Sequence, residues 1–134
     1  LGDSYSIQEI SCPLFVPIIE EGWADSTIAR DIAKIYLHDF ITSDIDTLIL
    51  GCTHYPIMAN TIQSLLPSQI QLVHSGKTVG YKLAEYLIKN NCESSLDVSR
   101  SVQFFVTDYP QKFDELGSRF LGRKLNNVTH ISLL

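Results

Sequence analysis

The chain contains the run Leu48-Ile49-Leu50-Gly51-Cys52-Thr53-His54-Tyr55-Pro56, from which its fold is best inferred. Three apolar residues with the character of a buried strand are followed at once by a glycine, a thiol, a hydroxyl and an imidazole. Open α/β sheets bind ligands at the carboxyl ends of their strands, which is where these polar groups fall. Pro56 lacks a backbone donor and marks the turn into the next element. The run therefore predicts a buried strand with a functional site at its carboxyl end.

Strand-like and helix-like segments alternate on both sides of this run. Strands are predicted over residues 7–10, 47–50, 70–73, 102–106 and 128–133. Helices are predicted from Asp25 or Ser26 to about residue 40, over 58–66, over 78–90, and from Pro110 to a cap at Gly122. The first helix has these apolar residues at helical spacing: Ile28, Ile32, Ile35, Tyr36 and Phe40. Residues 92–101 are polar and are predicted to form a loop. Alternation of this kind indicates an α/β fold built from parallel βα units.

Composition and length exclude several classes of protein. The 134 residues make about one domain on the usual prior of roughly 100–200 residues. A net charge of −5 without a cluster of Lys and Arg argues against a nucleic-acid partner. No apolar stretch approaches the roughly 20 residues that cross a membrane. The chain starts with Leu1 and shows no signal peptide, so we expect a fragment or a processed product. Cys12, Cys52 and Cys92 are widely spaced, which fits reduced thiols in a cytoplasm.

Cys52 and His54 are the residues best suited to chemistry. Only a thiolate acts as a base or nucleophile, so the Cys52 thiol needs a partner that takes or offsets its proton. His54 can do this by hydrogen bonding or by positive charge, and the backbone amides of the following turn favour the anion further. In the alternative interpretation, Cys52 is a small buried hydrophobe and His54 a core histidine. Their spacing alone slightly favours that alternative.

The remaining polar motifs are weaker. Glu20 and Glu21 close an apolar stretch, where a carboxylate can orient His54 but is more often part of a solvated loop. The run Ser75-Gly76-Lys77-Thr78 resembles the tail of a phosphate-binding loop, yet Gln71 stands where that motif requires glycine. No Cys-x-x-Cys or His-x-x-x-His pair occurs, so no metal site is predicted.

The run Gly51-Cys52-Thr53-His54-Tyr55-Pro56 resembles the second active-site cysteine motif of the bacterial glutamate racemases, in the aspartate/glutamate racemase family. The run Ser11-Cys12-Pro13-Leu14-Phe15-Val16-Pro17-Ile18-Ile19-Glu20 is similar to the segment of that family that carries an active-site glutamate. Phe105-Val106-Thr107-Asp108, Phe120-Leu121-Gly122 and residues 128–133 resemble its closing strand, helix and strand. The similarity covers nearly the whole chain and only the C-terminal half of the family's length.

The resemblance implies a cofactor-independent racemase that interconverts L- and D-glutamate for peptidoglycan synthesis, and so for cell-wall biogenesis and cell shape, in the cytoplasm. The family uses two cysteines on opposite faces of the substrate, because inversion at Cα needs an acid/base group on each face. On this basis Cys52 is expected to be the base toward the L enantiomer and Thr53 to bind substrate. His54 is expected to assist Cys52, and Glu20 to orient His54 or the substrate ammonium. The expected partner is glutamate, and a homodimer is left open.

The resemblance also implies a two-domain, racemase-like fold. Residues 1–75 are expected to form part of the second domain, and residues 76–134 to return to the first. The family's Asp-Ser-Gly signature, first catalytic cysteine and Asn-Thr pair have no counterpart here, so we expect the 134 residues to be inactive alone. Two other functions stay open: a hydrolase or acyl transferase using Cys52 and His54, and a non-catalytic α/β ligand-binding domain with a buried Cys52.

Overall fold

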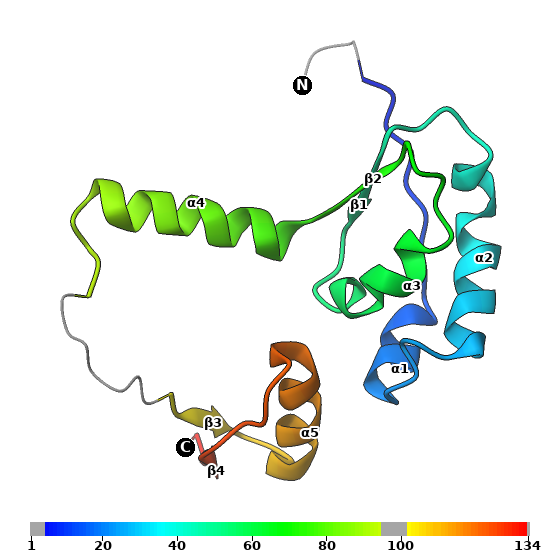
Figure 1. The fold of residues 1–134 in the computed structure, drawn as a ribbon. Coiled ribbons are helices and arrows are strands. Elements are labelled where there is room, and N and C mark those ends of the chain that lie inside the picture. Colours follow the sequence, from blue (N-terminus) through cyan, green and yellow to red (C-terminus); the bar gives the residue numbers. More distant parts are fainter. Residues whose placement is uncertain (1–4, 95–101, 134) are drawn as a thin grey trace. The chain divides into compact units, whose positions relative to one another are not determined.

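A computed structural model describes residues 5–94 and 102–133, and it confirms the α/β class (Figure 1). In chain order the elements are helices α1 (Phe15–Glu20) and α2 (Thr27–Ile41), strand β1 (Thr47–Leu50), 3-10 helix η1 (Tyr55–Met58), helix α3 (Ala59–Gln63), strand β2 (Gln71–His74), helix α4 (Ser75–Lys89), strand β3 (Phe104–Val106), helix α5 (Pro110–Leu121) and strand β4 (Val128–His130). The chain divides into two compact units, Leu1–Tyr86 and Leu87–Leu134. The predicted domain assignment of 1–75 and 76–134 stays a prediction.

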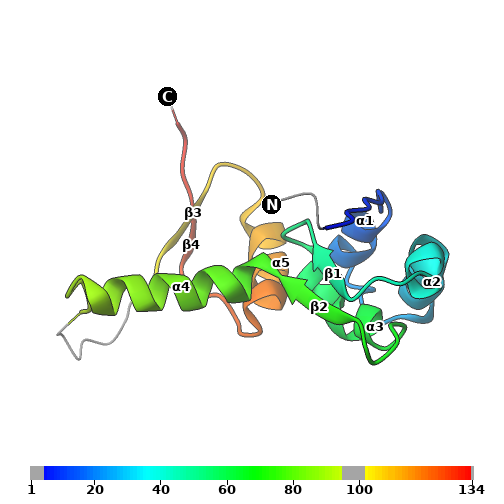
Figure 2. The ribbon, with the colours of Figure 1, turned by 90° about the horizontal axis from the view of Figure 1, so that it is seen from above.

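In the first unit, β1 and β2 pair in parallel, as the alternating pattern predicts. Thr47 lies opposite Gln71 and Leu50 opposite His74, so both strands end at the same edge of the sheet. The two strands run side by side in both ribbon views, with η1 and α3 in the connection between them (Figures 1 and 2). The residues that follow Leu50 therefore leave the sheet at its carboxyl edge.

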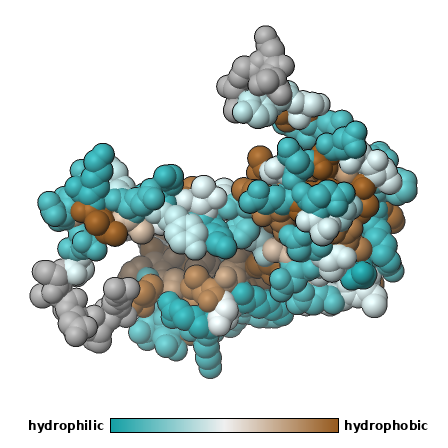
Figure 3. Space-filling view, turned by 45° about the horizontal axis from the view of Figure 1, so that its top comes forward, coloured by the Kyte–Doolittle hydropathy of each residue, from teal (hydrophilic) through white to brown (hydrophobic). Residues whose placement is uncertain are grey.

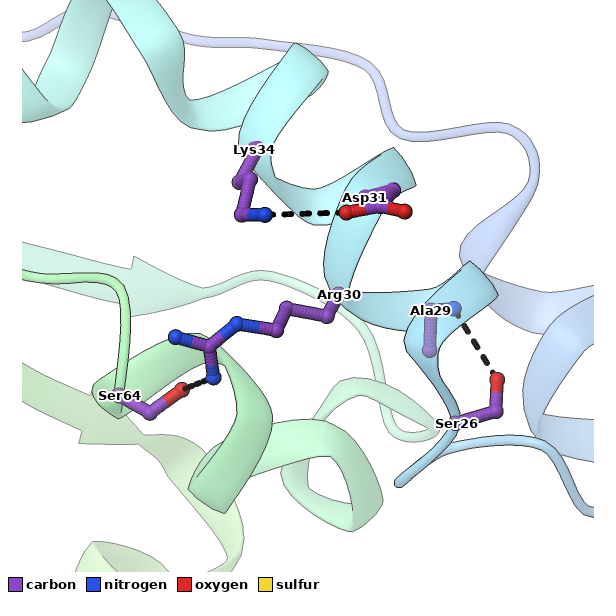
Figure 4. A network of polar contacts seen from close by, with 6 residues as sticks. All are labelled: Ser26, Ala29, Arg30, Asp31, Lys34 and Ser64. Carbon is purple, nitrogen blue, oxygen red and sulfur yellow. Dashed lines mark hydrogen bonds and ion pairs between the residues drawn. The ribbon is translucent and has the colours of Figure 1, made fainter.

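The core of this unit is formed by α1, α2, η1, α3 and the sheet. Its largest fully buried side chains are Phe15, Ile19, Met58 and Ile62. A polar link joins the same elements at the surface, where the Arg30 guanidinium of α2 donates to the hydroxyl of Ser64, just after α3, at 2.9 Å (Figure 4). This hydrogen bond links α2 to the end of α3 at the surface.

Helix α2 begins where the sequence predicts. Ser26 is its N-cap and accepts a hydrogen bond from the Ala29 amide at 3.1 Å (Figure 4). The buried face differs from the predicted one, because Ile28 and Ile35 are exposed. The buried residues of the helix are Ala29, Ala33, Leu37 and Phe40. This face combines two small residues with the large apolar side chains of Leu37 and Phe40.

The second unit is a smaller parallel pair with one helix. Phe104 lies opposite Val128 in the pairing of β3 with β4. Pro110 is in the first turn of α5, and Gly122 ends that helix at φ 61°, both as predicted. Leu125 is buried after the helix and lies against Gly117, where a Cβ atom would come within 2.6 Å of its Cδ1.

Several boundaries differ from the predictions. Within the described residues 5–10 there is no strand, so the strand predicted over 7–10 is wrong. Helix α4 begins at Ser75, three positions earlier than predicted, and residues 95–101 of the predicted loop lie outside the described residues. None of the side chains of α4 is buried. Its apolar residues contribute to the hydrophobic side chains exposed on the molecule, some of which are visible in Figure 3.

Candidate functional site

The residues predicted to act together lie at the carboxyl edge of the β1–β2 sheet. Gly51 follows the last residue of β1, and Cys52, Thr53 and His54 form a bend before η1. Pro56 lies in the first turn of η1, where its missing N–H removes no helical hydrogen bond. Cys52 is half-buried, so the interpretation of this thiol as a fully buried hydrophobe is wrong.

Three of the predicted side chains form a continuous chain of contacts. The Cys52 Sγ atom lies 3.9 Å from His54 Nδ1. On the other side of the ring, His54 Nε2 lies 3.5 Å from Glu20 Oε1, at the end of α1. The side chains of His54 and Glu20 are 26% and 35% exposed, so water reaches this pair and weakens its electrostatic attraction. The contact between His54 and Glu20 therefore serves mainly to orient the His54 ring and adds little to stability.

One tautomer of the neutral His54 imidazole fits both of these contacts. A neutral imidazole carries a proton on one nitrogen and accepts at the other, and a carboxylate only accepts. With its proton on Nε2, directed at Glu20, the His54 ring presents Nδ1 as an acceptor to the Cys52 thiol. The Thr53 hydroxyl lies 3.5 Å from the same Nδ1 atom. The arrangement can take a proton from sulfur and return it.

Aromatic side chains support this site from behind. The Phe15 ring packs edge-on against Tyr55, with centroids 5.3 Å apart, and against Tyr36, with centroids 5.4 Å apart. The Tyr55 hydroxyl donates to the Cys12 carbonyl oxygen at 3.4 Å, and the Leu14 amide donates to the Tyr36 hydroxyl at 3.4 Å. Burial raises the pKa of Tyr55, and the neighbouring Cys12, Cys52 and Tyr36 raise it further. The sequence did not predict that these three aromatic residues support the site. The only signal for such a role was that Tyr55 adjoins His54.

The side chains of Cys12, Cys92 and Glu21 are not part of the Cys52–His54–Glu20 series of contacts. Cys12 is buried, and its burial raises the pKa of its thiol, which favours the uncharged form. Cys92 is exposed, and so is Glu21, the C-cap residue directly after α1. Among the described residues, no group of three or more His, Cys, Asp and Glu side chains is arranged to hold a metal ion. In that same part of the chain, no helix combines the length and hydrophobicity needed to cross a membrane.

The fold and these contacts define a parallel α/β protein with a thiol, an imidazole and a carboxylate at the edge of its sheet. No family model matches the chain. Curated relatives do match. The chain is 38% identical over 132 residues to the glutamate racemase of Chlorobaculum parvum, covering 98% of this chain and 48% of that relative. It is 38% identical to the glutamate racemase of Syntrophus aciditrophicus, covering 92% of this chain and 46% of that relative.

Solved structures agree with these relatives. Glutamate racemase from Francisella tularensis in complex with D-glutamate matches with a TM-score of 0.78 and 35% identity, covering 90% of this chain and 45% of that one. Glutamate racemase from Thermus thermophilus in complex with β-chloro-D-alanine matches with the same TM-score and identity, covering 92% of this chain and 47% of that one. Over nearly its whole length the chain is similar to glutamate racemases, and it aligns with their C-terminal half. It spans about half the length of the curated relatives it matches.

Proposed function

We propose that this chain supplies one of the two acid/base groups of a glutamate racemase, and that Cys52 is that group. The observation that carries the proposal is the series of contacts from Cys52 through His54 to Glu20 at the sheet edge, in a chain similar to glutamate racemases. The relatives are named for action on glutamate, and one of the matching structures holds D-glutamate. The proposed substrate is therefore glutamate.

In the proposed reaction the Cys52 thiolate takes the Cα proton of L-glutamate. The Cα–H bond breaks, an S–H bond forms, and the electron pair stays on the substrate as a carbanion. A second thiol on the opposite face then gives its proton to Cα, which inverts the configuration. In the reverse direction the two sulfur atoms exchange roles, so the reaction needs no external oxidant or cofactor.

His54 and Glu20 keep the Cys52 thiol ready for this proton transfer. His54 Nδ1 accepts the thiol proton and so favours the thiolate, while Glu20 fixes the ring through Nε2. Thr53 follows Cys52 directly and is exposed, and its proposed role is to bind a polar end of the substrate. The Cα–H group of glutamate is a weak acid. Cys52 is therefore a suitable base only when its thiolate and the bound substrate are shielded from water.

We propose that the second thiol comes from outside the 134 residues described by this sequence. Cys12 is unsuited because it is buried and its raised pKa keeps it protonated. Cys92 is exposed in a polar segment unlike the family's first cysteine motif. A cytoplasmic role in supplying D-glutamate for peptidoglycan, and through it in cell-wall biogenesis and cell shape, follows from the same similarity and is part of the proposal.

The test uses the full-length protein with L-glutamate in D₂O. Loss of optical rotation and entry of deuterium at Cα are followed together. Cys52→Ser is expected to lower kcat at least about 100-fold, because a hydroxyl is a far weaker acid than a thiol. Cys92→Ser, a matched change at an exposed thiol, is expected to stay within about twofold. Full activity of the Cys52→Ser protein would overturn the proposal.

The same contacts favour a second candidate, because a thiol, an imidazole and a carboxylate in series are also the parts of a cysteine hydrolase. A hydrolase forms a covalent acyl-enzyme at sulfur, whereas a racemase never does. Mass spectrometry of Cys52 after incubation with activated acyl esters separates the two. An acyl adduct that turns over, together with unchanged optical rotation of glutamate, identifies the hydrolase.

A further inference from the structure

Glu20 and His54 come from two separate segments, and their contact depends on how those segments are held together. Glu20 is the last residue of α1, while His54 precedes η1. The 3.5 Å between His54 Nε2 and Glu20 Oε1 is at the long end of a charge-assisted contact. A small shift of α1 would therefore break it.

Tyr55 contacts both segments. It follows His54 in the chain and begins η1, directly after residues 51–54, which form the site loop. Its hydroxyl donates to the Cys12 carbonyl oxygen, and its ring packs edge-on against Phe15, the first residue of α1. The Cys12 carbonyl also accepts the Phe15 amide at 3.1 Å, so this oxygen receives two donors where α1 begins.

Helix α1 is anchored in the core at its start by Phe15 and near its end by Ile18 and Ile19. Phe15 is 1% exposed and is held between two aromatic rings, whereas the Glu20 side chain is about one-third exposed. A helix of six residues is a rigid body over its length of roughly 9 Å at 1.5 Å per residue. The packing at Phe15 is therefore one of the contacts that set where the Glu20 carboxylate lies.

We propose that Tyr55 is a positioning residue that holds the start of α1 against the site loop and so keeps Glu20 in contact with His54. The inference rests on the proposed function for its kinetic consequence, but the contact itself can be measured without turnover. Tyr55 does not touch the reacting atoms in this scheme. Its effect passes entirely through Glu20.

The experiment introduces Tyr55→Phe into two backgrounds of the full-length protein, unchanged and Glu20→Gln, and uses Tyr81→Phe as a separate control variant. Tyr81→Phe is the matched control, because it removes a hydroxyl from an exposed tyrosine of α4. Tyr55→Phe keeps the ring and removes only the hydroxyl, so the fold is retained, which thermal unfolding checks. The imidazole ¹⁵N signals of His54 report the Glu20 contact, and racemisation kinetics report its use.

We expect Tyr55→Phe to move the His54 ¹⁵N signals in the same direction as Glu20→Gln and by a smaller amount. We expect it to lower kcat about threefold with KM unchanged, as the loss of one weak hydrogen bond implies. In the Glu20→Gln background Tyr55→Phe should have no further effect on kcat, because the Glu20–His54 contact through which it acts is already lost. Tyr81→Phe should change neither readout.

Two results would overturn the inference. One is an unmoved His54 signal in folded Tyr55→Phe protein. The other is an equal loss of kcat from Tyr55→Phe in the unchanged and Glu20→Gln backgrounds, which would show that the hydroxyl acts by another route. If the His54 signals move as expected but the protein does not racemise glutamate, the positioning role stands and the proposed function fails.

Discussion

At the scale of single residues, the site depends on which of two adjacent carboxylates faces His54. Glu20 lies 3.5 Å from the ring, whereas Glu21 is exposed beyond the end of α1. The two residues have the same chemistry and differ only in direction. They form a matched pair for mutation.

Glu20→Gln is expected to lower kcat about tenfold, because the neutral amide cannot favour the imidazolium that forms when His54 takes the thiol proton. Glu21→Gln is expected to stay within about twofold of the unchanged protein. Initial rates of racemisation at saturating glutamate measure both. Equal losses in the two variants would contradict the assigned geometry.

The buried thiol of Cys12 gives stability a pH dependence. Burial raises its pKa, so the folded protein keeps this proton at pH values where an exposed thiol, with a pKa of about 8.5, has lost it. The unfolded state then binds fewer protons, and the free energy of unfolding falls as pH rises above about 8.5. One group contributes at most about 1.4 kcal/mol per pH unit.

Cys12→Ala removes this contribution, so its free energy of unfolding should fall less steeply between pH 8.5 and 10, a range chosen from the ordinary thiol value of about 8.5. Urea unfolding of the full-length protein at several pH values measures the slope. Cys92→Ala, at an exposed thiol, should leave the slope unchanged. A steeper fall for Cys12→Ala than for the unchanged protein would be inconsistent with a raised pKa.

The residues of the site could be found from the sequence, but their support could not. Cys52, Thr53 and His54 are contiguous, and Glu20 was reached through the resemblance to the family. Phe15 and Tyr55 are far apart in the chain, so no local sequence pattern predicts that their rings pack together. Side-chain contacts between segments depend on packing, which periodicity does not encode.

At the scale of elements, one glycine stabilises the end of α5 and another weakens the interior of α4. Gly122 ends α5 with φ 61°, a left-handed conformation that costs other residues free energy. Gly80 lies inside α4, and an added Cβ would meet nothing within 4 Å. Alanine should therefore weaken one helix and strengthen the other.

We expect Gly122→Ala to destabilise α5 by about 1 kcal/mol and Gly80→Ala to stabilise α4 by a similar amount. Amide hydrogen exchange within each helix measures the two changes separately, as about fivefold faster exchange in α5 and about fivefold slower exchange in α4. The same sign of change in both helices would refute the assignment of Gly122 as a left-handed cap.

Element types were largely predictable and element faces were not. Strand β1, helix α2 with its Ser26 cap, and the Gly122 cap all match the predictions, because each has a strong local signal. The strand predicted over 7–10 is absent from the described residues, since a short apolar run forms a strand only with a partner. In α2 the alanines face the core, which an analysis of large apolar residues overlooks.

At the scale of the whole molecule, about half the length of the relatives is matched here. We expect the 134 residues alone to invert the configuration of glutamate at under about 1% of the full-length rate, because inversion needs an acid on the second face. Loss of optical rotation of L-glutamate measures this rate. Robust racemisation by the 134-residue chain would show that both thiols lie within it.

Helix α4 contributes none of its side chains to a core, which sets how it melts. Unwinding it hydrates almost no new apolar surface, so calorimetry of the 134-residue chain should record no heat-capacity step for this segment. Cold denaturation requires such a step. The α4 helix should therefore lose order smoothly on warming and gain it steadily on cooling toward the freezing point.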